Sequence, residues 1–164
     1  MFEARSFDEL AQPIRKARFE GFDADNITHF HHALAARPLR HNRLTKTELL
    51  AYDENIVRHW RRIAARRHLK GNTLYPKYFQ YLALLFTEIY LDRYFRDPGH
   101  LLADLNLFVK DFNRDHDGAD RADPYRPGDL NNLALWSATG SCKTLPMRRA
   151  ASKLYSPFYL KSQI

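Results

Sequence analysis

Apolar residues return at helical spacing through most of the chain, and the clearest pattern lies between residues 47 and 69. Four large apolar side chains are separated there by seven, four and three residues, which places them on one face of a helix: Leu49, Ile56, Trp60 and Ile63. The segment is followed by Lys70 and Gly71, a common way for a helix to end. The pattern therefore predicts a long helix with one buried stripe.

Two shorter helices are predicted nearer the N-terminus. Ser6 and Glu9 have the spacing of a capping box, and the helix that they open is expected to extend to about Arg18. A second helix is expected over residues 27–36, because the following Arg37–Pro38 step disfavours helical backbone. Two residues are candidates for its N-cap, Asp25 and Asn26.

The middle of the chain predicts a buried helix and another helix after it. Residues 78–95 are apolar nearly all round, which is typical of a helix at the centre of a bundle. Asp97–Pro98 then supplies a cap and a first-turn proline for a helix over residues 99–112. Residues 113–128 are rich in Asp, Pro and Gly and read as a loop. We therefore expect three parts: a helical N-terminal domain (1–113), a linker loop (114–128) and the start of another domain (129–164).

Basic residues are concentrated in one segment of the chain. The whole chain has 26 basic and 19 acidic residues and a net charge of +7. Residues 37–70 hold ten bases and three acids, and ten minus three is again seven. Such a block is typical of a contact with a polyanion, although a solvated basic helix face is the alternative interpretation. The candidate nucleic-acid-binding residues are Arg58, Arg61, Arg62, Arg66 and Arg67.

Other features narrow the class of protein. Cys142 is the only cysteine, which excludes an internal disulfide framework. The N-terminal residues mix acids and bases and predict no secretory leader, and no apolar run is long enough to cross a bilayer, so we expect a cytoplasmic protein without a membrane partner. His29, His31 and His32 lack a carboxylate or thiol that would complete a metal-ligand set, and we expect them to be surface or partly buried side chains.

A phosphate-binding pattern follows the predicted linker. Residues 133–136 (Leu-Ala-Leu-Trp) suit a short buried strand, and residues 137–144 read Ser-Ala-Thr-Gly-Ser-Cys-Lys-Thr. This is close to the P-loop pattern G-x-x-x-x-G-K-[ST], whose backbone N–H groups hold phosphate oxygens while its lysine reaches the β- and γ-phosphates and its hydroxyl binds Mg²⁺. The candidate ATP-binding residues are Thr139, Gly140, Ser141, Cys142, Lys143 and Thr144, with Thr144 as the Mg²⁺ ligand.

Two positions depart from the P-loop pattern. Ser137 replaces the first glycine with another small residue. Cys142 replaces the second glycine, where the backbone is pressed against phosphate and a Cβ takes both room and backbone freedom. In addition, no Asp or Glu follows Asp129, so the carboxylates that hold Mg²⁺ and position water in such enzymes have no counterpart. We therefore expect no ATPase activity from the chain by itself.

Two stretches resemble a known family. Residues 77–95 resemble the helix that precedes the motor in bacterial DEAD/DEAH-box helicases related to the helicase subunit of type III restriction enzymes, and residues 129–141 are similar to the run into their first ATPase motif. The resemblance covers roughly residues 72–144 and implies an ATP-driven, Mg²⁺-dependent DNA helicase or translocase with two RecA-like lobes. Twenty residues follow Thr144, so we expect a truncated N-terminal part whose partners are DNA and the missing remainder of the helicase.

The predicted fold is mainly α, with a helical N-terminal bundle followed by the first strand and P-loop of a truncated α/β, RecA-like domain. The predicted function is that of the truncated N-terminal part of a restriction-type, ATP-dependent DNA helicase. The alternative is a stand-alone basic helical module that binds nucleic acid or another protein and matches the P-loop pattern by accident.

Overall fold

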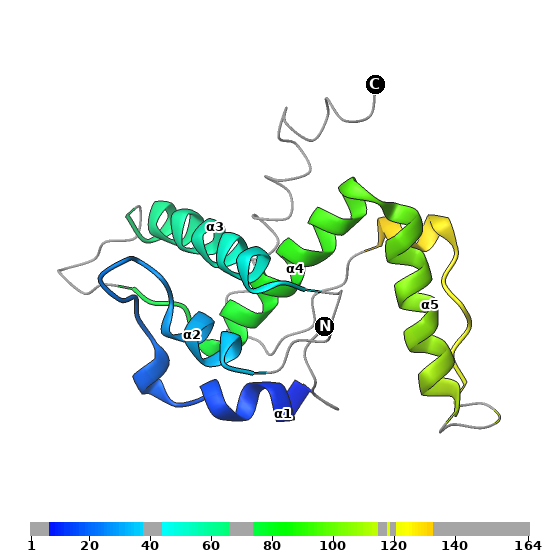
Figure 1. The fold of residues 1–164 in the computed structure, drawn as a ribbon, viewed down its shortest axis with the longest axis horizontal. Coiled ribbons are helices and arrows are strands. Elements are labelled where there is room, and N and C mark those ends of the chain that lie inside the picture. Colours follow the sequence, from blue (N-terminus) through cyan, green and yellow to red (C-terminus); the bar gives the residue numbers. More distant parts are fainter. Residues whose placement is uncertain (1–6, 38–43, 66–73, 115–117, 119–120, 133–164) are drawn as a thin grey trace. The chain divides into compact units, whose positions relative to one another are not determined.

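The computed structural model describes residues 7–37, 44–65, 74–114, 118 and 121–132 (Figure 1). These residues are mainly helical and contain no β-strand beyond a single antiparallel bridge between Phe22 and Thr28. The mainly α class is therefore confirmed for the described residues, whereas the predicted strand and P-loop (133–144) lie outside them. The chain divides into two compact units, Met1–Thr87 and Glu88–Ile164.

The first unit begins with a shorter helix than the sequence predicts. Helix α1 spans Phe7–Ala11, and two 3-10 turns follow it, η1 at Gln12–Ile14 and η2 at Ala17–Phe19. The expected continuous helix to Arg18 is therefore wrong. The reason is Pro13, because a proline removes a backbone donor and restricts the residue before it.

Helix α2 spans His29–Ala35, and its N-cap is neither of the two expected residues. Thr28 has extended backbone, and its side-chain oxygen accepts a hydrogen bond from the His31 backbone N–H at 2.9 Å. Helix α2 packs against α3 and against η1. Its large apolar residues Phe30 and Leu34 are fully buried.

Helix α3 spans Lys46–Ala65 and carries the buried stripe that the sequence predicts. Leu49, Ile56 and Trp60 are buried, whereas Ile63 is only partly so. The helix starts with a capping box, because the Glu48 N–H donates to Thr45 Oγ1 at 3.1 Å and the Thr45 N–H donates to Glu48 Oε2 at 2.8 Å. The predicted residues 66–69 of this helix lie outside the described residues.

Helix α4 spans Tyr78–Arg96, close to the expected 78–95. At its N-terminus, Gln80 Oε1 accepts a hydrogen bond from the Lys77 N–H at 2.9 Å. In the first unit, Tyr81, Leu82 and Leu85 of α4 are fully buried, as a helix that is apolar nearly all round requires.

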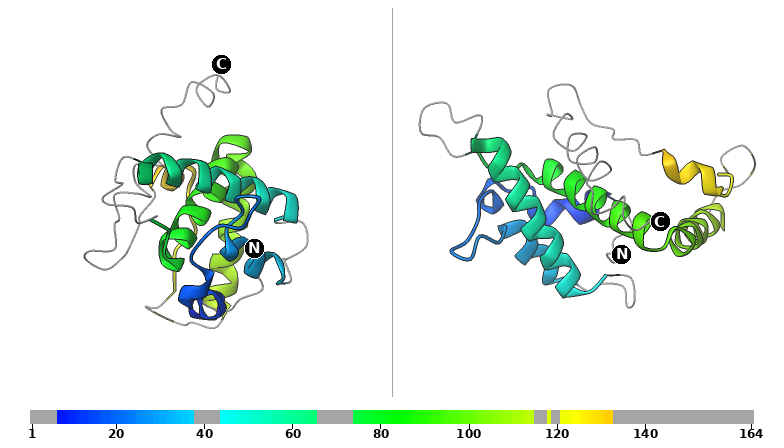
Figure 2. Two further views of the ribbon diagram at one scale, coloured as in Figure 1. Left: turned by 90° about the vertical axis from the view of Figure 1, so that its left-hand side faces the viewer. Right: turned by 90° about the horizontal axis from the view of Figure 1, so that it is seen from above.

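The second unit contains helix α5, Pro98–Arg114, and the 3-10 helix η4, Pro127–Asn131, which packs beside α5 (Figure 2, right). Asp97 caps α5 as predicted, accepting from the His100 N–H at 2.9 Å. Asn106 exchanges two hydrogen bonds with the Tyr125 backbone, at 2.7 and 3.0 Å. The described end of the expected linker is therefore bonded to α5. The expected domain limits stay a prediction.

Candidate nucleic-acid interface

Helix α3 positions three of the candidate arginines. The buried residues of α3 occupy one side of the helix, and Arg58, Arg61 and Arg62 are all exposed. The exposed charged residues of α3 are Lys46, Glu54, Arg58, Arg61 and Arg62. Four bases less one acid leave a net charge of +3 on this surface. The other two candidates, Arg66 and Arg67, lie outside the described residues.

Two of the three acids of the basic segment are held in hydrogen bonds within the fold. Asp53 is fully buried, and Glu48 is held in the capping box with Thr45. Only Glu54 is exposed among the three acids of residues 37–70. Within the described residues, no ion pair is formed by Arg58 or Arg62. Four of the five exposed charged residues of α3 are therefore basic.

Arg61 also contacts the loop over residues 21–28 and so links this loop to α3. Its guanidinium donates a hydrogen bond to the Asn26 side-chain oxygen. The same guanidinium lies 5.4 Å from the centre of the Phe22 ring, within the range of a cation–π contact. Arg61 is therefore partly a structural residue, whereas Arg58 and Arg62 present their charges to solvent.

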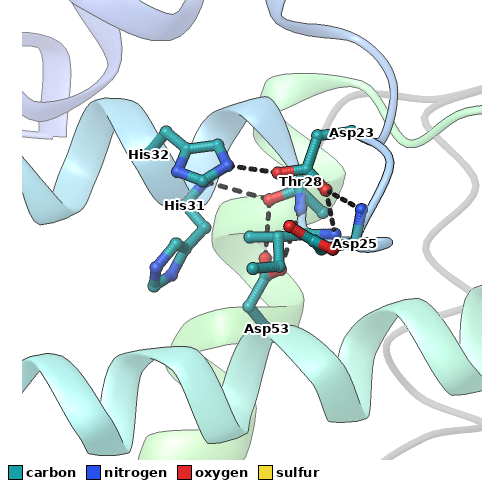
Figure 3. A network of polar contacts seen from close by, with 7 residues as sticks. Asp23, Asp25, Thr28, His31, His32 and Asp53 are labelled. Atoms are coloured by element: carbon teal, nitrogen blue, oxygen red, sulfur yellow. Dashed lines mark hydrogen bonds and ion pairs between the residues drawn. The ribbon is translucent and has the colours of Figure 1, made fainter.

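The loop over residues 21–28 is held together by Asp23 (Figure 3). Asp23 Oδ1 accepts hydrogen bonds from the backbone N–H groups of Asp25 at 3.0 Å and Ile27 at 2.9 Å, and Oδ2 lies 2.6 Å from His32 Nε2. The hydrogen bond with His32, followed by that from Ile27, lowers the pKa of Asp23. Asn26 adopts a positive φ of 66°, a conformation that asparagine tolerates better than most residues.

A buried carboxylate joins this loop to the helices. Asp53 of α3 accepts three hydrogen bonds: from the Thr28 N–H at 2.9 Å, from the Thr28 hydroxyl at 2.6 Å and from the Tyr81 hydroxyl at 2.7 Å. Figure 3 shows Asp53 extending from α3 toward Thr28 at the start of α2. Burial, and then the Asp53 charge, raises the pKa of Tyr81 well above its usual value. The network is fully bonded and serves the fold.

The His31 ring lies next to this network without joining it, whereas the His31 backbone N–H donates to Thr28 Oγ1 (Figure 3). The side chain is buried more deeply than the sequence leads one to expect, and its Nδ1 has no hydrogen-bond partner. Burial lowers the pKa of His31, so the ring favours its neutral form. His29 is half-buried and His32 is exposed. Among the residues whose positions are described, no three His, Cys, Asp or Glu side chains come together as metal ligands.

An aromatic surface adjoins Arg61. The indole N–H of Trp60 donates to the Leu74 carbonyl at 2.8 Å, which brings the segment before α4 back onto α3. Tyr75 then meets Phe22 edge to face, with ring centres 5.3 Å apart and an interplanar angle of 72°. This surface was missed by the sequence interpretation, because it joins residues that lie more than fifty positions apart.

Asp53 was likewise missed, although a signal for it exists. It stands four residues after Leu49 and three before Ile56, and so on the buried face of α3. An acid at such a position indicates a bonded network, because burying an unpaired carboxylate is too costly. The ATP-binding candidates Thr139 to Thr144 lie outside the described residues, and the structure bears on none of them.

Comparison of the chain with protein-family models, with curated proteins and with solved structures finds no match. The resemblance to DEAD/DEAH-box helicases therefore stays a prediction from the residues quoted above. Within the described segments, none of the helices combines the length and apolar character needed to cross a membrane.

Proposed function

We propose that this chain is the N-terminal part of an ATP-dependent DNA helicase or translocase, and that its helical region contacts nucleic acid through α3. The observation that carries the proposal is the exposed basic face of α3, with Arg58 and Arg62 four residues apart and Arg61 between them. Four bases against one acid on this face supply the attraction to phosphate on which nucleic-acid binding largely depends.

The motor half of the proposal rests on the sequence of residues 133–144. Lys143 and Thr144 occupy the positions that bind phosphate and Mg²⁺ in a P-loop, so ATP and Mg²⁺ are the proposed cofactors. Cys142 occupies the position of the second glycine, and no Asp or Glu follows Asp129. We therefore expect this chain to need further residues, from the remainder of the motor, before it can hydrolyse ATP.

A stand-alone basic helical module is the second candidate function. The observation that favours it is Cys142, since a Cβ at the second glycine opposes phosphate binding and leaves the P-loop match weak. Both candidates use the same face of α3 for nucleic acid. They differ in nucleotide binding: in a chain extended through the missing lobe, Cys142→Gly restores ATP binding in the motor proposal and has no effect in the module proposal.

The experiment that tests the shared part measures DNA affinity against salt concentration for the full chain. Fluorescence anisotropy with a short labelled duplex is recorded for the unmodified chain and for Arg58→Ala with Arg62→Ala. If both arginines contact phosphates, the slope of log affinity against log salt falls in magnitude by about 1.8. The matched control is Lys110→Ala with Arg121→Ala, which removes two exposed charges from the second unit and should leave most of the slope intact.

Equal losses for both double variants would show that only the net charge of the chain matters. A chain with no salt-dependent binding at all would overturn the proposed contact with nucleic acid.

A further inference from the structure

The basic face of α3 continues into a surface with aromatic side chains. Leu74 is 42% exposed and Tyr75 is 37% exposed, which is unusual for large apolar side chains next to a well-packed helix. Phe22 lies against Tyr75 and beneath the Arg61 guanidinium. We propose that this surface, the aromatic platform of Phe22, Leu74 and Tyr75, receives unpaired bases, so that the preferred ligand of the α3 face is single-stranded nucleic acid. The inference rests on the proposed function and deepens it.

The platform is held in place before any ligand binds. The Trp60 indole fixes the Leu74 carbonyl at 2.8 Å, and Pro76, directly after Tyr75, is buried. On the other side, Arg61 holds the loop that carries Phe22 through its contacts with the Phe22 ring and the Asn26 side chain. A surface ordered in this way loses little conformational entropy when a base packs on it.

The chemistry of the platform favours unpaired bases over a duplex. Aromatic side chains stack on bases of any sequence, because every base has a π-face. In a duplex the bases are already stacked on each other and turn only their edges outward, so an exposed tyrosine gains nothing comparable. An apolar platform without charge would fit many partners, and the adjacent arginines favour a partner that carries phosphates.

The arginines supply the second half of a single-strand site. Arg58 and Arg62 are exposed on the same helix as Arg61 and lie three residues before it and directly after it. Phosphates that contact them leave the bases of the same strand free to reach Tyr75. A row of basic side chains beside a stacking side chain is the combination that single-stranded nucleic acids require.

The test compares two probes on the full chain, an oligothymidylate of about 15 nucleotides and a duplex of the same length. Tyr75→Ala and Tyr75→Leu should weaken binding of the oligothymidylate by roughly five- to a hundredfold and change duplex binding little. Tyr75→Leu keeps an apolar contact with Phe22, so the affinity that this variant loses reports the missing aromatic ring. Tyr75→Phe keeps the ring and should bind as the unmodified chain does. Tyr125→Ala, which removes an exposed tyrosine from the second unit, is the control.

A fluorescent adenine analogue in the oligonucleotide gives a direct readout of stacking. We expect the unmodified chain and the Tyr75→Phe variant to quench it, and the Tyr75→Leu variant to lose this quenching. Equal affinity for both probes, unchanged by Tyr75→Leu, would overturn this inference while the contact with nucleic acid stands. Absence of binding to either probe would remove the proposed function itself. Far-UV circular dichroism of each variant shows whether it is folded.

Discussion

The Tyr81 hydroxyl is the most informative single group to remove, because it is fully buried and has one clear partner. Tyr81→Phe keeps the ring, which packs on Phe30 with centres 5.1 Å apart, and deletes only the oxygen that donates to Asp53 at 2.7 Å. The substitution therefore tests the buried carboxylate network and leaves the apolar packing of α4 in place.

The expected loss follows from the charge on the acceptor. A hydrogen bond to a charged group contributes about 1.5–3 kcal/mol, and Asp53 keeps its two bonds from Thr28, so we expect Tyr81→Phe to lower the free energy of unfolding by about 2 kcal/mol. Asp53→Ala leaves three buried donors without a partner at about 1–3 kcal/mol each, and so costs more. Asp53→Asn has the size of Asp but turns an NH₂ group toward one of these donors, so it should also cost more than Tyr81→Phe.

Urea unfolding followed by Trp60 fluorescence measures these losses in the first unit. Trp136, the other tryptophan, is replaced by Phe in all samples so that the signal belongs to Trp60. The control is Tyr125→Phe, an exposed tyrosine that should change stability by less than about 0.5 kcal/mol. If Tyr81→Phe costs no more than this control, the Asp53 network does not hold the loop to α3 and the reasoning is wrong.

Three further predictions concern single groups. The lowered pKa of His31 means that the unfolded chain binds a proton at higher pH than the folded chain, so stability should fall as the pH drops below about 6.5. In urea titrations at several pH values, His31→Leu should remove this loss of stability and His100→Leu should retain it. Both Asn26→Ala and Asn26→Gly lose the hydrogen bond to Arg61, but only glycine accepts the positive φ without strain, so Asn26→Ala should lower the free energy of unfolding by about 1–2 kcal/mol more than Asn26→Gly. Equal melting temperatures for the two variants would contradict this. Lys143→Ala should leave ATP hydrolysis at the same background level as the unmodified chain, and hydrolysis that this change abolishes would refute an inactive P-loop.

Most helices of the described residues could be predicted from the spacing of apolar side chains. The stripe of α3 and the all-apolar α4 report burial directly, because a helix turns its faces at a constant angle. The ends of the helices were harder to predict. The predicted first helix continued past Pro13, whereas α1 in the structure ends at Ala11. The capping box of Thr45 and Glu48 was not predicted, although its spacing is visible in the sequence.

The site was predictable only where it lies on one helix. Arg58, Arg61 and Arg62 could be placed from the sequence, because spacings of three and four residues put side chains on one side of α3. The Asp53 network and the aromatic platform depend on contacts between residues 28, 53 and 81, and between residues 22 and 75. No local pattern encodes such pairings, since they arise from how the loop, α3 and α4 pack together.

The amide NMR spectrum of the full chain during titration with a short DNA duplex tests the proposed contact with nucleic acid most directly, because it locates the contact residue by residue. We expect the largest salt-sensitive shifts from residues 58–62 of α3, with smaller ones in the loop over residues 21–28. Shifts confined to α5, or none in α3 at a DNA concentration that saturates binding, would contradict the proposal.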